Sequence, residues 1–294
     1  MADPKPSKPA QTHLRKPPWI KVKAFGGNTF NEVSGLLRER GLFTVCQEAN
    51  CPNRGECFSR GTATFLILGP VCTRNCRFCD VRPGKPPAPD AQEPRLVAEA
   101  VALMKLRHAV VTSVTRDDLP DGGAEQFASV IREIRNTSPK CTIEVLTPDF
   151  NGDRQSLAIV LDARPDIFNH NVETVPELYP TVRPAADYQQ SLEVLRISAE
   201  EFKLPTKSGL MVGLGETTGQ LERVFTDLAA RSVSMLTIGQ YLAPSADHLP
   251  VVRYLPPEEF DRLAETARAA GIAQVFAGPL VRSSYLADRM VSAL

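Results

Sequence analysis

Three cysteines stand close together in the segment GPVCTRNCRFCDV, which spans residues 69–81. Cys72, Cys76 and Cys79 follow the spacing C-x3-C-x2-C, directly after the apolar run TATFLIL. Three thiols on one short loop can converge on a single metal centre, whereas a closed structural zinc site takes four ligands. The segment therefore predicts a metal centre at which one coordination position has no protein ligand.

A second cysteine group precedes the first. Cys46, Cys51 and Cys57 are spaced C-x4-C-x5-C in VCQEANCPNRGECF, residues 45–58. The chain has seven cysteines, and the odd count favours ligands or catalytic groups over a disulfide framework. The seventh, Cys141, begins the apolar stretch CTIEVL and is interpreted as a small buried hydrophobic residue.

Six units of a β-like run followed by a helical stretch begin at residue 62. Apolar, β-branched runs separated by amphipathic helices predict an α/β fold, in which helices cover a parallel sheet. A full or incomplete barrel fits this pattern, and ligands of such barrels collect where the strands end. Polar residues follow the first run from Cys72 and the later runs at 115–118, 147–149, 169–173, 213–216 and 240–245. Capping of the next helix is the alternative for several of them.

Length and composition set further bounds. The 294 residues have a formal net charge of zero, which argues against general affinity for nucleic acid. No apolar run approaches the roughly 20 residues that a membrane span needs, and the N-terminus lacks the apolar core of a signal peptide. We therefore expect a cytoplasmic protein without nucleic-acid or membrane partners. Three parts are expected: an N-terminal extension (1–61), a barrel (62–272) and a C-terminal extension (273–294).

The C-x3-C-x2-C group, with Phe78 before its last cysteine, resembles the signature of radical S-adenosylmethionine enzymes. The resemblance implies a partial (β/α)6 barrel of that type. It also implies a four-iron four-sulfur cluster on three cysteines, with S-adenosylmethionine on the open iron. A zinc knuckle or a non-catalytic electron-transfer cluster is the competing interpretation.

A narrower resemblance, to the lipoyl synthase family, comes from ANCPNRGEC together with CTRNCRFCDV, and from FNHNVETVPELYPTVRP and GPLVRSSY. It implies a sulfurtransferase of lipoate biosynthesis that inserts sulfur at C6 and C8 of a protein-bound octanoyl-lysine. A second four-iron four-sulfur cluster on the other cysteine group would be the sulfur donor. A serine of RSSY would complete this cluster, with Ser284 preferred over Ser283. Another radical sulfur-inserting enzyme is the alternative within the superfamily.

Polar residues at the strand ends suggest further contacts, and the resemblance suggests partners. Asn171 and Glu173 are candidates for the ribose or methionine end of S-adenosylmethionine, Arg183 for its carboxylate, and Lys207 or Ser208 for the substrate mouth. Ordinary surface ion pairs are the alternative for Arg183 and Lys207. Implied partners are octanoylated carrier domains, such as acyltransferase subunits or the glycine-cleavage H protein, together with a flavodoxin or ferredoxin and an iron–sulfur carrier protein.

Overall fold

Eight strands form the central sheet, in the order β1-β2-β5-β6-β7-β8-β9-β10. The computed structural model describes residues 14–22, 26–285 and 287. All neighbours from β2 to β10 pair in parallel, and β1 pairs with β2 antiparallel. The sheet strands are β1 (Phe43–Thr44), β2 (Thr64–Ile67), β5 (His108–Ser113), β6 (Thr142–Leu146), β7 (Ile167–Asn169), β8 (Thr206–Val212), β9 (Met235–Gln240) and β10 (Gln274–Gly278).

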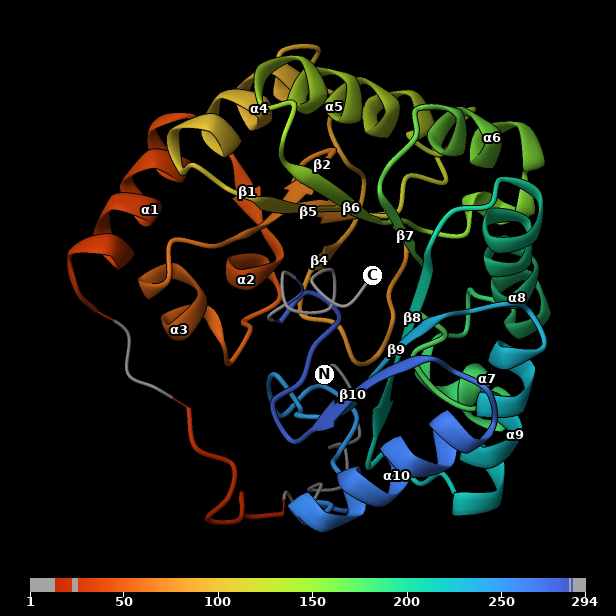
Figure 1. Cartoon of the computed structure of the whole chain (residues 1–294). Coiled ribbons are helices and arrows are strands. Elements are labelled where there is room, and N and C mark those ends of the chain that lie inside the picture. The colour runs from red at the N-terminus through yellow and green to blue at the C-terminus, as the bar shows by residue number, and fades with distance from the viewer. Residues whose placement is uncertain (1–13, 23–25, 286, 288–294) are drawn as a thin grey trace, which may run out of the picture.

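Helices surround this sheet in an arc (Figure 1). The six longer helices that follow a parallel strand are α4 (Glu93–Leu103), α5 (Ala124–Thr137), α6 (Arg154–Asp162), α8 (Tyr188–Arg196), α9 (Thr218–Ala229) and α10 (Pro257–Ala269). The others are α1 (Asn28–Glu39), α2 (Val45–Glu48), α3 (Arg54–Ser59) and α7 (Tyr179–Val182), with short helical turns η1 (Phe150–Gly152), η2 (Pro176–Leu178) and η3 (Ile197–Glu201).

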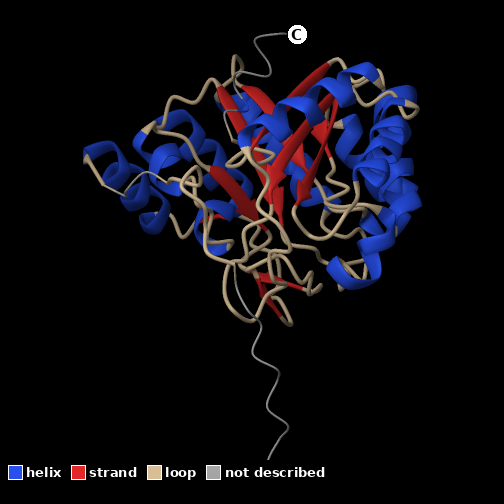
Figure 2. Cartoon of the chain, turned by 90° about the horizontal axis from the view of Figure 1, so that it is seen from below, coloured by secondary structure: helices blue, strands red, loops and turns tan. Residues whose placement is uncertain are grey.

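The six predicted strand–helix units are confirmed, because each parallel strand from β2 to β9 is followed by a helix before its sheet neighbour begins. Apolar helix faces account for the packing: Phe127 of α5, Phe225 of α9 and Phe260 of α10 are buried. Figure 2 shows the strands in the middle with helices outside them. This is the expected α/β architecture, with the carboxyl ends of the strands gathered at one edge.

The sheet also takes a strand from each predicted extension, namely β1 and β10. A further pair of two-residue strands, β3 (Val71–Cys72) and β4 (Arg82–Pro83), flanks the first cysteine group. The ends of both extensions lie outside the described residues, and the boundaries at 61/62 and 272/273 stay a prediction. No helix in the described ranges is both long and apolar enough to cross a membrane.

Candidate active site

A cavity of about 450 Å³ brings the two cysteine groups and the RSSY segment together. Side chains from β5, β6, β8 and β9 also line it, so it lies along the inner face of the sheet and at the strand ends. The predicted residues on its wall are Cys46, Cys51, Cys57, Cys72, Cys76, Cys79, Asn171, Glu173, Arg183, Ser283 and Ser284. Segments more than two hundred residues apart in sequence therefore share one cavity.

The first cysteine group is attached to the strand ends by its own backbone and by Arg74. Cys72 Sγ accepts hydrogen bonds from the backbone N–H groups of Arg74 (3.4 Å) and Thr115 (3.3 Å). Thr73 Oγ1 donates to the carbonyl oxygen of Thr115 at 2.9 Å. These contacts join the cysteine loop to the residues that follow β5.

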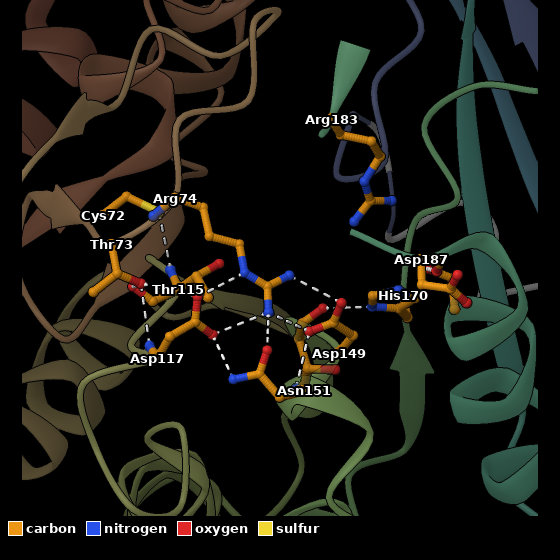
Figure 3. A network of polar contacts seen from close by, with 12 residues as sticks. Cys72, Thr73, Arg74, Thr115, Asp117, Asp149, Asn151, His170, Arg183 and Asp187 are labelled. Atoms are coloured by element: carbon orange, nitrogen blue, oxygen red, sulfur yellow. Dashed lines mark hydrogen bonds and ion pairs between the residues drawn. The ribbon is translucent and has the colours of Figure 1, made fainter. Parts of the chain in front are cut away.

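Arg74 lies between two carboxylates (Figure 3). Its guanidinium donates to Asp117 (2.8 and 3.0 Å), to Asp149 (2.9 and 2.8 Å) and to Asn151 Oδ1 (2.7 Å). Burial alone would raise the pKa of Asp149, but the hydrogen bonds and charge of Arg74 outweigh it and lower that pKa to about 2. A buried, fully paired arginine thus connects the cysteine loop with the ends of β5 and β6.

The second cysteine group is carried by short helices. Thr44 Oγ1 caps α2 by accepting from the N–H of Gln47 (3.3 Å), which places Cys46 within that helix. Cys57 lies in α3, and Cys51 lies between the two helices. Two contacts bind α3 and its cap to the C-terminal segment: Asn53 Nδ2 donates to the carbonyl oxygen of Leu280 (2.7 Å), and Tyr285 Oη donates to Glu56 Oε2 (3.3 Å).

Burial raises the pKa of four of the six cysteine thiols on the cavity wall. Burial, with a smaller effect of Cys51, raises the pKa of Cys46 to about 12 and that of Cys57 to about 11. In the first group, burial raises the pKa of Cys76 to about 11 and that of Cys79 to about 12. Ligand thiols lose their protons when a metal binds.

The donor set fits iron–sulfur clusters. Each group offers three soft sulfur donors that are near enough to affect one another's pKa. Among the described residues, no three His, Cys, Asp or Glu side chains meet closely enough to hold a single metal ion. A cluster, in contrast, binds each cysteine at a different iron atom, so its ligands need not converge on one point.

The two serines of RSSY have different surroundings. Ser283 Oγ accepts a hydrogen bond from Asn171 Nδ2 at 2.7 Å, and the Ser283 carbonyl oxygen accepts from Lys207 Nζ at 2.6 Å. The Ser284 hydroxyl has no hydrogen-bond partner in the part of the chain that the structure describes, and it lines the cavity. These contacts favour Ser284 as the residue with a hydroxyl available for a ligand.

The structure corrects the expectation for Lys207 and Ser208. Neither residue lines the cavity. Lys207 is completely buried and pairs with buried Glu144 at 2.9 Å, so it makes no surface ion pair. Ser208 is also buried, and its Oγ donates to the carbonyl oxygen of His170 at 2.9 Å. Both belong to the interior of the sheet because β8 begins at Thr206, ahead of them.

Arg183 makes no surface ion pair either. Its side chain is 8% exposed, its Nη1 donates to the carbonyl oxygen of Asn171 (2.9 Å), and its guanidinium carbon lies 5.1 Å from the Tyr179 ring centroid. Glu173, near this cation, is partly buried, and desolvation raises its pKa although the charge of Arg183 opposes the rise. Both residues reach the cavity wall, as a cofactor contact requires.

The sequence analysis gave no individual role to His170, Thr147 and Arg282, which also line the cavity. His170 Nδ1 lies 2.9 Å from the Thr147 carbonyl oxygen, and burial lowers the pKa of His170 to about 4, so the ring is neutral near pH 7. Its Nε2 is buried without a hydrogen-bond partner among the described residues, as is Arg183 Nε. Thr147 and His170 could have been found from the sequence, because they lie in the strand-end ranges 147–149 and 169–173.

Comparisons with known proteins extend over most of the chain. Residues 66–228 match the family model described as the radical SAM superfamily. The chain is 57% identical over 282 residues to the lipoyl synthase of Methylococcus capsulatus, covering 95% of this chain and 87% of that protein. It is 54% identical over 280 residues to the lipoyl synthase of Chlorobium chlorochromatii, covering 95% and 96%.

Solved structures match the fold at low sequence identity. Streptococcus suis SuiB bound to S-adenosylmethionine superposes with a TM-score of 0.56 at 8% identity, covering 72% of this chain and 49% of that one. Coproporphyrinogen III oxidase from Escherichia coli gives a TM-score of 0.51 at 14% identity, covering 69% and 51%. These likenesses show a shared α/β fold.

Proposed function

Since the chain belongs to the lipoyl synthase family of radical S-adenosylmethionine enzymes, we propose that it inserts sulfur at C6 and C8 of an octanoyl group bound to a carrier-protein lysine. One observation carries this proposal: both cysteine groups and Ser284 line a single cavity. A carbon that is activated by one group can therefore meet sulfur held by the other.

Cys72, Cys76 and Cys79 would hold the resident cluster. When bound there with S-adenosylmethionine, this cluster supplies a radical that can abstract hydrogen from saturated carbon, which no side-chain base can deprotonate. The chain's own residues bind and orient: Arg183 offers a buried cation for the S-adenosylmethionine carboxylate, and Glu173 and Asn171 offer polar atoms on the same wall. Arg74 holds the cysteine loop against the strand ends.

The octanoyl chain needs an apolar wall that excludes water. Leu66, Val110, Leu210 and Met211 line the cavity and can provide such a wall. Burial of an alkyl chain is favourable by about 0.8 kcal/mol per CH2 group. Shielding from water also protects a carbon radical from side reactions.

The sulfur source would be a second four-iron four-sulfur cluster, used as a substrate and held by Cys46, Cys51, Cys57 and Ser284. A serine oxygen is a hard ligand in a set of soft thiolates. Such a ligand can leave its iron when sulfur is removed. The Ser284 hydroxyl, which lines the cavity and has no hydrogen-bond partner among the described residues, supports this assignment.

The partners follow from this chemistry. An octanoylated carrier domain, such as an acyltransferase subunit or the glycine-cleavage H protein, delivers the alkyl chain. A flavodoxin or ferredoxin supplies electrons, and an iron–sulfur carrier protein rebuilds the consumed cluster. We also propose that the reaction takes place in the cytoplasm and that the chain has three parts, at 1–61, 62–272 and 273–294.

Anaerobic reconstitution with an octanoyl-lysine peptide tests the proposal. The unaltered chain should form deoxyadenosine and insert sulfur. The Cys46→Ala, Cys51→Ala and Cys57→Ala variants should still form deoxyadenosine but lose sulfur insertion. Normal lipoyl product from these variants would show that the donor assignment is wrong, and an unaltered chain that forms no deoxyadenosine would point to a non-catalytic iron–sulfur protein.

A further inference from the structure

Two glycines on neighbouring strands leave a slot on the inner face of the sheet, and the C-terminal segment occupies it. A Cβ atom on Gly239 of β9 would lie 2.2 Å from the Val281 carbonyl oxygen. A Cβ atom on Gly209 of β8 would lie 3.0 Å from Ser283 Oγ and 2.7 Å from Asn171 Oδ1. Neither glycine has a left-handed φ angle, so close approach of other atoms, and not backbone conformation, explains them. At Gly239 the nearest atom belongs to the segment, whereas at Gly209 Thr237 Oγ1, at 2.6 Å, is nearer than Ser283.

Lys207 holds the segment inside this slot. It lies two residues before Gly209 on β8, and residues two apart in a strand face the same side. Its Nζ donates to the Ser283 carbonyl oxygen at 2.6 Å and to Glu144 Oε1 at 2.9 Å. The hydrogen bond to Ser283 is a main-chain contact made by a charged donor, a class stronger than hydrogen bonds between neutral groups.

Glu144 is the buried counter-ion of Lys207. It lies on β6, and its Oε1 also accepts from Asn169 Nδ2 at 3.0 Å, while its Oε2 lies 3.3 Å from His108 Nε2. Both partners of the ion pair are 0% exposed. Such a pair costs desolvation energy that its attraction only partly repays, so it is weak evidence for stability. Because Lys207 joins Glu144 to the Ser283 carbonyl oxygen, the ion pair can instead serve to hold the C-terminal segment.

The other side of the segment contacts α3, the helix that carries Cys57, and the cap of that helix. Asn53 Nδ2 donates to the Leu280 carbonyl oxygen, and Tyr285 Oη donates to Glu56 of α3. Residues 280–285 are therefore held between the inner face of the sheet and α3. Ser284 lies within this held segment and directly follows Ser283, the residue that Lys207 contacts.

We propose that Lys207 is a positioning residue for the reaction. With Glu144 behind it, and with the slot at Gly209 and Gly239, it fixes the main chain at Ser283 so that the Ser284 hydroxyl reaches the second cysteine group. This inference rests on the proposed function, because the ligand role of Ser284 is part of that proposal. Lys207 itself does not line the cavity.

Two variants displace the segment without leaving a lone buried charge. Gly239→Ala adds one methyl group where the Val281 carbonyl oxygen now lies. The double variant Glu144→Gln, Lys207→Met removes both charges together and keeps the side-chain sizes close. Gly219→Ala in α9 is the matched control, because a Cβ atom there would meet nothing within 4 Å.

The first readout is amide hydrogen exchange of residues 280–285 in the cluster-free chain. Exchange should be at least about tenfold faster in Gly239→Ala and in the double variant, a loss of about 1.4 kcal/mol of local protection, and unchanged in Gly219→Ala. Because no cluster or substrate is present, this readout stands even if the unaltered chain inserts no sulfur. Failure of the proposed function is thus distinguishable from failure of this inference.

The second readout is iron and sulfide bound after reconstitution in a background with Cys72, Cys76 and Cys79 replaced by alanine, so that only the second group is counted. Both displaced variants should retain several-fold less iron than Gly219→Ala. With the first group intact, they should form deoxyadenosine at the unaltered rate while sulfur insertion falls. Unchanged exchange overturns the inference, as does faster exchange with full iron retention.

Discussion

The two cysteine groups line the same cavity, yet different parts of the fold hold them. Cys72, Cys76 and Cys79 lie on one loop, which Arg74 connects to residues after β5 and β6. Cys46, Cys51 and Cys57 lie on and between short helices outside the six strand–helix units, and their region contacts a segment more than two hundred residues later. The family model for the superfamily covers only the first group.

This difference indicates that the first cysteine group is held by nearby elements of the sheet, whereas the second also depends on a distant segment of the chain. The first group depends on neighbouring strand ends, which form as the parallel sheet forms. The second group depends on contacts between the two ends of the chain, and ordering such distant segments carries the cost of closing a long loop. We therefore expect local opening at the second group to require less free energy than opening at the first.

The largest expected effect separates the two groups chemically. Cys72→Ala should abolish both deoxyadenosine formation and sulfur insertion, because the radical source loses a ligand. Ser284→Ala should abolish sulfur insertion alone. Product analysis by mass spectrometry, with deoxyadenosine measured in the same samples, checks both results.

Ser283→Ala is the matched control for Ser284. It removes an oxygen that accepts from Asn171 but leaves the main-chain contact with Lys207, so a partial loss is expected. A Ser284→Cys variant with full turnover would contradict the argument for a hard ligand at this position.

Arg74→Met should lower the free energy of unfolding, because Arg74 joins the loop of the first cysteine group to two carboxylates. The change leaves Asp149 buried without its cation, and breaking a buried ion pair in this way costs about 3–5 kcal/mol. Urea unfolding of the cluster-free, reduced chain measures the loss. Arg95→Met is the control: its pair with Glu99 is exposed, and a change below about 1 kcal/mol is expected. Equal losses in the two variants would contradict a special role for Arg74.

Arg74 also shows where the sequence stops being informative. The alternation of β-like and helical runs predicted six strand–helix units, and the strand-end ranges included Asp117 and Asp149. Nothing in the sequence joined these residues to the arginine between Cys72 and Cys76, because 43 and 75 residues separate the partners. Periodicity predicts elements, whereas such contacts depend on how parallel strands align.

Lys207 was assigned to the wrong environment for a related reason. The run TKSGLMV has no clean alternation of polar and apolar residues, so its inward face could not be read from the sequence. A lysine at the start of a strand is ordinarily exposed. Only the register with β7 and β9 places Lys207 on the face that carries Asn169, and with it the buried Glu144.

Acid should weaken the first group through Asp149. The pKa of this carboxyl falls from 3.8 to about 2 on folding, so its contribution is complete above about pH 5 and is lost as the pH falls toward 2. The shift corresponds to about 2 kcal/mol. Urea unfolding of the cluster-free chain at pH 6 and pH 3 should show a smaller pH dependence in Asp149→Asn than in the unaltered chain.

Asp153→Asn provides the comparison for acid unfolding. Asp153 is an exposed helix cap whose pKa is lowered by hydrogen bonds from Ser156. Solvent screens this group, so its replacement should change the pH dependence less than replacement of Asp149. The reverse order would mean that the Arg74 network does not dominate acid stability.

The smallest expected effect concerns the cysteine outside both groups. Burial raises the pKa of Cys141 to about 11, the same value as for Cys57, so the pKa of a thiol alone does not distinguish a ligand from a core residue. Its surroundings do: Cys57 shares the cavity with five other cysteines, two of them in its own group, whereas Cys141 lies in the core and its Sγ contacts the Thr142 carbonyl oxygen. Cys141→Ala should therefore lower the free energy of unfolding in urea by about 1 kcal/mol and leave the amount of bound iron unchanged. Cys57→Ala should lower the amount of bound iron. Loss of iron from Cys141→Ala would show that a seventh thiol takes part, and the division into two groups of three would no longer hold.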